Sequence, residues 1–134
     1  MPEITIAGRK IGAKHPPFII AEMSGNHNQS LERALEIVEA AANSGADAIK
    51  IQTYTAETMT LDISEGEFFI EDKNSLWKGK SLYELYEEAH TPWDWHKTIF
   101  ARAKEQGIIA FSSPFDATAV DFLEDLDVPC YKIA

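Results

Sequence analysis

Charged and polar side chains stand at or near the ends of four short apolar runs in this sequence. The runs are FIIAE, DAIKIQT, IIAFSS and VPCYKIA, and their polar side chains include Glu22, Lys50, Gln52, Ser112, Ser113 and Lys132. A carboxylate beside lysines suits a site that holds an anionic substrate next to a general acid or base. Because ligands bind at the carboxyl ends of parallel strands, the sequence predicts a binding site at that edge of a sheet.

Alternation along the second run indicates where its side chains point. Lys50 and Gln52 share one face of the expected strand, whereas Ile49 and Ile51 share the other. We expect the isoleucine face to pack beneath helices and the lysine face to point into the interior of a barrel. A lysine there is costly unless it meets an anion, and Lys132 repeats the pattern.

These residues also have purely structural interpretations. The two lysines and Glu22 can form an internal ion-pair network that supports a core, and the serines before Pro114 can shape a turn. His27 lies in the loop after Glu22, and we expect a hydrogen-bonding role more than a metal role, since no H-x-x-x-H or C-x-x-C spacing occurs. The three tryptophans and the Phe68-Phe69 pair could line a sugar pocket or fill a core.

Alternating strand and helix patterns position these side chains. A hairpin is expected at 3–12, and strands are expected at 18–22, 47–53, 108–113 and 128–134. The helices between them are expected to begin at the N-caps Ser30, Thr91 and Asp116, with a shorter helix at SLYELYEEA. This order predicts a parallel sheet with right-handed crossovers, either a flavodoxin-like open sheet or part of a (β/α)₈ barrel.

Two further features limit the function. Residues 54–80 show no clean periodicity, and a connection of that length is usually functional or mobile. The net charge of −10 argues against a surface for nucleic acid or for anionic membranes. No apolar run is long enough to span a bilayer, and the single Cys130 fits a reducing compartment, so we expect a cytoplasmic protein.

Three segments resemble the N-terminal part of the sialic acid synthase family. They are IIAEMSGNHNQSLERALEIVEAAANSGADAIKIQTYT, GIIAFSSPFD and YKIA, and the segment SLWKGKSLYELYEEAHTPWDWH is most similar to the pseudaminic acid synthase branch. The resemblance implies a (β/α)₈ TIM barrel. Residues 1–14 would be a β-hairpin plug, and residues 18–134 would supply about the first four strands. The remaining strands and an antifreeze-like C-terminal domain would be absent from this chain.

The resemblance also implies an activity. Phosphoenolpyruvate would condense with 2,4-diacetamido-2,4,6-trideoxy-altrose to give pseudaminic acid, with release of phosphate. Synthesis of N-acetylneuraminate or legionaminate is the alternative, and a non-catalytic fragment that binds a partner is an alternative of another class. The family implies a divalent metal, usually manganese, with ligands outside this chain, and a homodimer. The 134-residue chain alone is expected to be inactive.

Roles for individual residues follow from the matching motifs. Glu22 would be catalytic, Gln52 would face the sugar, and phosphoenolpyruvate would be bound by Lys50, Ser113 and Lys132. The residue before Pro-Phe is threonine in the sialic acid branch, so the serine here departs mildly from that motif. Asn26 and His27 match an Asn-His loop, to which the resemblance assigns no role.

Overall fold

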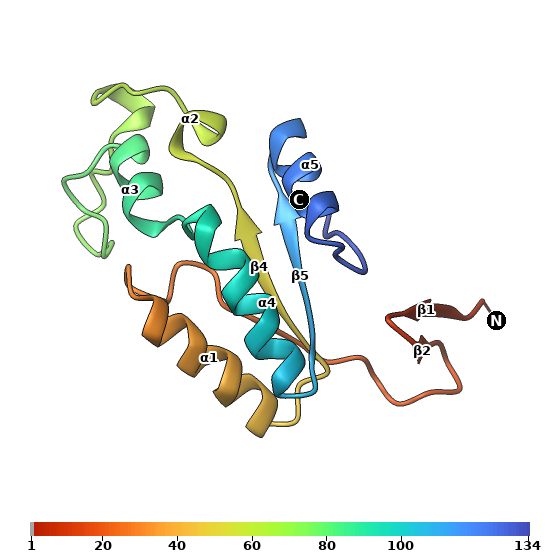
Figure 1. Cartoon of the computed structure of the whole chain (residues 1–134). Coiled ribbons are helices and arrows are strands. Elements are labelled where there is room, and N and C mark those ends of the chain that lie inside the picture. The colour runs from red at the N-terminus through yellow and green to blue at the C-terminus, as the bar shows by residue number, and fades with distance from the viewer. Residues whose placement is uncertain (1) are drawn as a thin grey trace.

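Strand β4 (Ala48–Thr53) forms the centre of a parallel sheet in the computed structural model, which describes residues 2–134. It lies between β3 (Ile20–Glu22) and β5 (Ile109–Pro114), and both neighbours run parallel to it (Figure 1). Three of the four expected strands therefore form, each beginning one or two residues later than expected.

The register of the sheet places polar residues side by side. Glu22 of β3 is paired with Lys50 of β4, and Gln52 of β4 is paired with Ser113 of β5. Paired residues of parallel strands project to the same face of a sheet. Glu22, Lys50, Gln52 and Ser113 therefore share one face, in two successive rows, whereas Ser112 is paired with Ile51 and projects to the other face.

Helices cover the opposite face of the sheet. Helix α1 (Leu31–Asn43) and helix α4 (His96–Glu105) pack against it side by side (Figure 1). Helix α5 (Ala117–Asp125) joins them, because its Phe122 ring contacts the ring of His96 at the start of α4. A doubly wound sheet would carry helices on both faces, whereas helices on one face are the arrangement of a barrel wall.

The core lies between the sheet and helices α1 and α4. Ile49 and Ile51 are fully buried there, as the alternation along β4 predicts. The other buried members of this cluster come mainly from the apolar stripes of the two helices, and they are Met23, Ala34, Val38, Ala41, Ile99 and Ala103. Burying apolar surface on this face alone leaves the Lys50 face available for a site.

Two of the expected helix caps are confirmed. The side chain of Ser30 accepts a hydrogen bond from the Arg33 N–H at the start of α1. The side chain of Asp116 accepts hydrogen bonds from the N–H groups of Thr118 and Ala119 at the start of α5. Both contacts satisfy donors that the first helical turn leaves free, and so they fix where each helix begins.

The expected cap at Thr91 is wrong. Pro92 instead precedes a short 3₁₀ helix, η2 (Trp93–Trp95), and α4 follows it directly. Thr91 is buried, and its hydroxyl has no hydrogen-bond partner among the described residues. A residue before proline favours extended backbone, which places Thr91 outside the first turn.

The expected fourth strand forms only in part. Residues 128–134 follow β5 through one parallel bridge, between Ser112 and Tyr131, and the Lys132 N–H donates to the Ser112 carbonyl at 3.1 Å. Pro129 has no N–H to give to a ladder, which limits the pairing at the start of the segment.

The connection from β4 to α4 contains several short elements. Helix α2 (Ala56–Met59) and the 3₁₀ helix η1 (Gly66–Phe68) precede the expected helix α3 (Leu82–Ala89). Ser81 caps α3 by accepting from the Glu84 N–H. Turns make up most of the rest of the connection. Hydrogen bonds between residues close in sequence therefore hold it in place more than long helices or strands do.

The N-terminal hairpin forms as expected. Strand β1 (Ile4–Ile6) pairs antiparallel with β2 (Arg9–Ile11). Ala7 and Gly8, at the turn, both have positive φ values of 47° and 83°. A two-residue turn with both central residues at positive φ is of the type that matches the twist of a hairpin.

No helix among the described residues is long and apolar enough to cross a lipid bilayer.

Candidate active site

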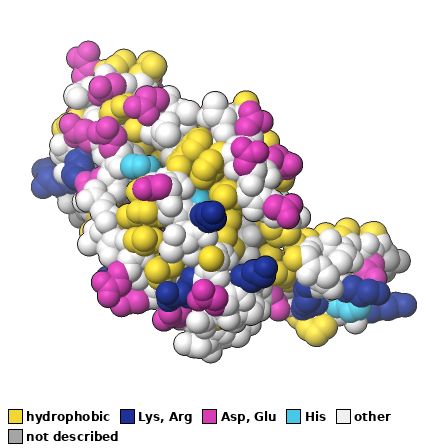
Figure 2. Space-filling model, in the orientation of Figure 1, with side chains coloured by type: hydrophobic (Ala, Val, Ile, Leu, Met, Phe, Trp, Pro, Cys, Tyr) yellow, Lys and Arg dark blue, Asp and Glu magenta, His cyan; other side chains and the backbone are white. Residues whose placement is uncertain are grey.

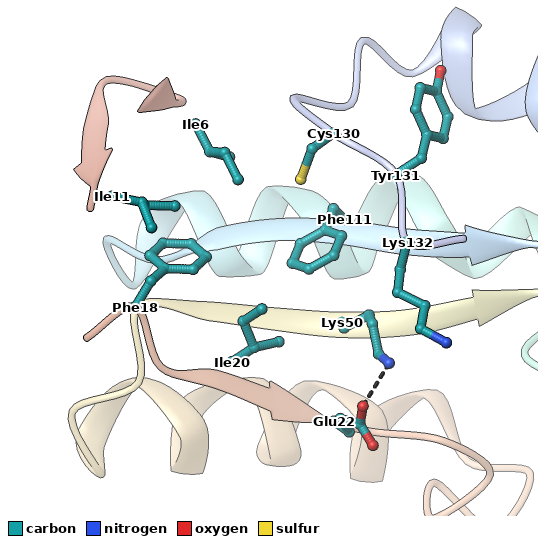
Figure 3. Close-up of a pocket in the computed structure, with 10 residues that line it drawn as sticks. All are labelled: Ile6, Ile11, Phe18, Ile20, Glu22, Lys50, Phe111, Cys130, Tyr131 and Lys132. Atoms are coloured by element: carbon teal, nitrogen blue, oxygen red, sulfur yellow. Dashed lines mark ion pairs between the residues drawn. The ribbon is translucent and has the colours of Figure 1, made fainter. Parts of the chain in front are cut away.

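The polar ends of β3 and β4 open onto a cavity of about 580 Å³, which we call the charged cavity. Its charged residues are Glu22, Lys50 and Lys132, which lie together at one end (Figure 3). Its other lining residues are Ile6, Ile11, Phe18, Ile20, Phe111, Cys130 and Tyr131. Ionic chemistry is therefore confined to one end of a pocket that is otherwise mostly apolar.

Glu22 and Lys50 form an ion pair at the carboxyl end of the sheet. The Lys50 ammonium lies 2.5 Å from Glu22 Oε1. The Lys50 side chain is 14% exposed and that of Glu22 is 64% exposed, so the carboxylate is the partner that faces solvent. The hydrogen bond from Lys50, together with its charge, lowers the pKa of Glu22, and Lys132 contributes in the same direction. Glu22 is therefore ionised at neutral pH and is ready to accept a proton.

Lys132 brings a second ammonium to the same end of the cavity. The bridge to β5 holds its backbone, and its side chain extends toward Lys50 and Glu22 (Figure 3). Two ammonium groups and one carboxylate leave one excess positive charge. This local excess lets an anion bind within a chain whose net charge is −10.

The opposite end of the charged cavity is apolar and includes the hairpin. Ile6 of β1 and Ile11 of β2 face the same space as Phe18 and Phe111 (Figure 3). The hairpin thus lies against the sheet face that the helices leave uncovered. An apolar wall close to an ion pair lowers the local dielectric and strengthens the attraction for an anion.

A second cavity, of about 360 Å³, adjoins the next row of the sheet, and we call it the aromatic cavity. Gln52 lines it from β4, and Asn26 lines it from the loop after β3. The remaining lining residues are Ser24, Gly25, Tyr54, Leu76, Trp77, Leu85, Tyr86 and Ala89. Amide groups and aromatic rings in one concave site are typical of pockets for small polar molecules.

Two predicted residues lie outside both cavities. Ser113 is 2% exposed and is paired with Gln52, but neither cavity is lined by it. His27 is fully buried, and its ring packs edge-on against Trp95 at 5.3 Å. Its Nδ1 accepts a hydrogen bond from the Gln29 N–H, and burial lowers its pKa. His27 thus supports the loop from beneath, as its hydrogen-bonding interpretation expects.

Of the aromatic residues considered for a sugar pocket, one tryptophan fits. Trp77 lines the aromatic cavity, whereas Trp95 packs on His27 and Trp93 packs on Phe122. Tyr54 and Tyr86, which also line this cavity, were not singled out from the sequence. Tyr54 follows Gln52 by two residues, and Tyr86 lies in α3. The sequence does not show that α3 packs close to β4, which is what brings the two rings together.

A buried hydrogen-bond network behind the site was also not predicted from the sequence. Thr53 Oγ1 lies 2.7 Å from His96 Nε2 and 2.6 Å from Ser112 Oγ, and all three residues are fully buried. Burial lowers the pKa of His96 to about 4, so its ring is neutral at pH 7. The network joins β4, β5 and α4 on the helix-covered face, behind the row that holds Gln52 and Ser113.

A complete metal site does not form from the described residues. No group of three or more His, Cys, Asp or Glu side chains among residues 2–134 is arranged to hold a metal ion. The expected manganese ligands outside this chain therefore stay a prediction.

Comparison with known proteins identifies relatives of this chain. The sequence profile of the NeuB family matches residues 37–134. The pseudaminic acid synthase of Campylobacter jejuni serotype O:2 is 53% identical over 117 residues, which cover 87% of this chain and 34% of that protein. The N,N'-diacetyllegionaminic acid synthase of Legionella pneumophila is 36% identical over 123 residues. The chain thus spans about a third of the length of these relatives.

The fold agrees with solved structures as well. The N-acetylneuraminic acid synthetase of Leptospira borgpetersenii superposes with a TM-score of 0.81 and 30% sequence identity, over 98% of this chain and 41% of that one. The spore coat polysaccharide biosynthesis protein SpsE of Bacillus subtilis superposes with a TM-score of 0.73. These neighbours confirm the expected fold, a part of a TIM barrel. With most of its length matched by the family profile, this chain belongs to the NeuB family.

Proposed function

We propose that this chain supplies part of an active site that condenses phosphoenolpyruvate with an amino-sugar aldose. The product is a nine-carbon, sialic-acid-like sugar, pseudaminic acid, and inorganic phosphate is released. The observation that carries the proposal is the Glu22–Lys50 pair at 2.5 Å, with Lys132 at the same end of an otherwise largely apolar cavity. That arrangement suits an anionic substrate beside a proton-transfer group.

The lysines would hold phosphoenolpyruvate. Its phosphate and carboxylate carry the charge that Lys50 and Lys132 can offset, and the paired ammonium of Lys50 is already at the cavity wall. Ser113 is the third proposed contact. It is buried beside Gln52, so a small shift of β5 would be needed before its hydroxyl meets the phosphate.

Substrate binding would raise the pKa of Glu22. In the ligand-free site, the bond from Lys50 lowers the Glu22 pKa. An anion that draws Lys50 toward itself removes that bond and adds negative charge nearby, and both changes raise the pKa of a carboxyl group. Both changes would make Glu22 a stronger base once the substrate is bound, so its carboxylate could then take up a proton and carry it.

The proposed chemistry joins two carbons and breaks one C–O bond. C3 of phosphoenolpyruvate attacks the aldehyde carbon of the open-chain sugar, and the aldehyde oxygen takes up a proton. Water then attacks C2, loses a proton to a base such as Glu22, and phosphate leaves with the bridging oxygen. Fixed positive charges lower the energy of the anionic intermediates along this path.

The relatives favour one sugar. Pseudaminic acid synthases of Campylobacter jejuni and Helicobacter pylori are 53% and 48% identical to this chain, whereas the diacetyllegionaminic acid synthase is 36% identical. We therefore propose 2,4-diacetamido-2,4,6-trideoxy-altrose as the acceptor, with Gln52 facing it. A divalent ion, proposed to be manganese, would polarise the aldehyde, and no step above depends on residues of this chain holding it.

Phosphoenolpyruvate labelled with ¹⁸O at the bridging oxygen tests the proposal. In the natural protein that contains this chain, the labelled oxygen is expected in inorganic phosphate, together with a nine-carbon acid detected by mass spectrometry. Competition between the diacetamido aldose and N-acetylmannosamine then identifies the acceptor. Label that remains with the carbon product would contradict the C–O cleavage, and a preference for N-acetylmannosamine would contradict the sugar.

A further inference from the structure

We propose that the aromatic cavity binds the C4 acetamido group of the sugar, which is the one of its two acetamido groups that lies farther from the aldehyde. The inference rests on the proposed function and extends it from a class of sugar to one substituent. It also assigns residues of the connection between β4 and α4, for which the family motifs gave no role.

The sheet fixes where this cavity lies relative to the reaction. Gln52 and Lys50 share a face of β4 and are two residues apart, and two residues of a strand span about 7 Å. Lys50 lines the charged cavity and Gln52 lines the aromatic cavity. A sugar whose aldehyde lies near Glu22 and Lys50 can therefore place its distal carbons in the aromatic cavity, one row farther along the sheet.

The lining combines the two kinds of group that an acetamido substituent needs. Such a substituent has a planar amide that donates and accepts hydrogen bonds, and a methyl group that is apolar. The amides of Asn26 and Gln52 can bond to the former, and the Asn26 NH₂ is held by a 2.9 Å bond to the Met23 carbonyl. The rings of Trp77 and Tyr86 can cover the latter. A lone hydroxyl group would leave those rings without an apolar partner.

The aromatic wall is largely preorganised. Tyr54 is 4% exposed, and its ring meets Tyr86 and Phe115 edge-on, with centroids 5.6 Å away in each case. The Lys80 ammonium lies 5.8 Å from the centre of the Trp77 ring and pairs with Glu88 of α3. Rings held in place before binding lose little freedom when a ligand arrives.

Leu76 gives the cavity an apolar rim. It lines the aromatic cavity, yet it is 96% exposed, the most exposed of the large hydrophobic residues among those described. A leucine at the mouth of a pocket gains apolar contact when a methyl group enters beside it. Leu76 and Trp77 would thus close over the acetamido methyl group from the solvent side.

Two aldoses that differ at one position test this assignment. They are 2,4-diacetamido-2,4,6-trideoxy-altrose and its counterpart with a hydroxyl group at C4. The natural protein is expected to prefer the first in kcat/KM, and Trp77→Ala is expected to reduce that preference about tenfold or more, mainly through KM. Leu76→Ala should reduce it less. Leu61→Ala is the matched control, because Leu61 is also exposed in this connection but lines neither cavity.

A binding measurement separates this inference from the proposed function. Saturation-transfer NMR should show the C4 acetamido methyl group in closest contact with the wild-type protein, and Trp77→Phe should retain most of that contact. If Trp77→Ala lowers kcat/KM for both sugars equally, or if the C4 methyl group shows no preferential contact, the acetamido assignment is wrong. If the protein binds the sugars but condenses neither, the proposed function fails while the cavity assignment stands on the NMR result.

Discussion

At the scale of single residues, Glu22 gives the most direct prediction. Its side chain is 64% exposed and its one strong contact is Lys50, so Glu22→Gln should leave the fold intact. Loss of a general base typically lowers turnover by about 10²-fold or more. Phosphate release in the natural protein measures the effect. Glu36→Gln, at an exposed position of α1, is the control, and turnover within a few-fold of wild type for Glu22→Gln would remove Glu22 from the mechanism.

Lys50 gives a different kind of prediction. Lys50→Met keeps the length of the side chain and removes its charge, so phosphoenolpyruvate should bind at least tenfold more weakly while sugar binding changes little. The substitution also frees Glu22 from its partner, and its carboxyl pKa should rise toward the ordinary value. Calorimetric titration with each substrate is the measurement. Unchanged affinity for phosphoenolpyruvate with altered affinity for the sugar would reassign this lysine.

At the scale of elements, the network of Thr53, His96 and Ser112 links stability to pH. The folded pKa of His96 is about 4, below the ordinary value of 6.5, so the unfolded chain binds the proton more readily. Its contribution is therefore fully present above pH 6.5 and is lost as the pH falls toward 4. The difference corresponds to about 3 kcal/mol.

Urea unfolding at pH 7 and at pH 4.5 measures this effect. His96→Gln should be less stable than wild type at pH 7, because a buried bond to Thr53 is weakened, yet should lose less stability on acidification. His27, whose pKa burial also lowers, titrates in the same direction and remains in both proteins, so the comparison cancels it. Equal losses in the two proteins would show that His96 does not titrate within this range.

The contact between the loop after β3 and helix α3 gives another element-scale prediction. A Cβ added at Gly25 would come within 3.1 Å of both the Cβ and the carbonyl oxygen of Ala89. Gly25→Ala should therefore push α3 away from the loop, destabilise the fold by about 1–3 kcal/mol, and weaken sugar binding more than phosphoenolpyruvate binding. Thermal unfolding and titration with each ligand check this. An unchanged melting temperature would show that Ala89 can move aside without loss of stability.

At the scale of the whole molecule, unpaired strand edges and exposed hydrophobic side chains, several groups of which are visible in Figure 2, predict self-association. Ile19 and Ile20 are about half exposed, and Ile133 is 82% exposed. Unpaired strand edges beside apolar surface favour pairing with another copy. The polypeptide of residues 1–134 should therefore run larger than a monomer at tens of micromolar. Light scattering on a sizing column measures this, and a clean monomer would contradict it; the homodimer stays a prediction until then.

Local sequence patterns predicted the features of this fold that depend on neighbouring residues, which are the two faces of β4 and two of the helix caps. Alternation along β4 separated the isoleucine face from the lysine face, and Ser30 and Asp116 cap helices as expected. The network of His96 could not be predicted, because its partner Thr53 lies 43 positions earlier and meets it only after α4 packs on the sheet. The aromatic cavity was missed for the same reason: α3 must fold back over β4 before its tyrosine and the tryptophan share a space.

The ion pair between Glu22 and Lys50 makes the charged cavity selective for multiply charged anions over singly charged ones. Before any anion can use Lys50, it must compete with a carboxylate 2.5 Å away that belongs to the protein. A singly charged ion such as chloride or acetate offers no more charge than Glu22 and gains little from the exchange. A multiply charged ligand that also reaches Lys132 gains a second ammonium, and so it can displace Glu22. Cellular monovalent anions are therefore expected to compete poorly. In the proposed reaction, the site would also have to release inorganic phosphate, a multiply charged anion of the kind that it binds best.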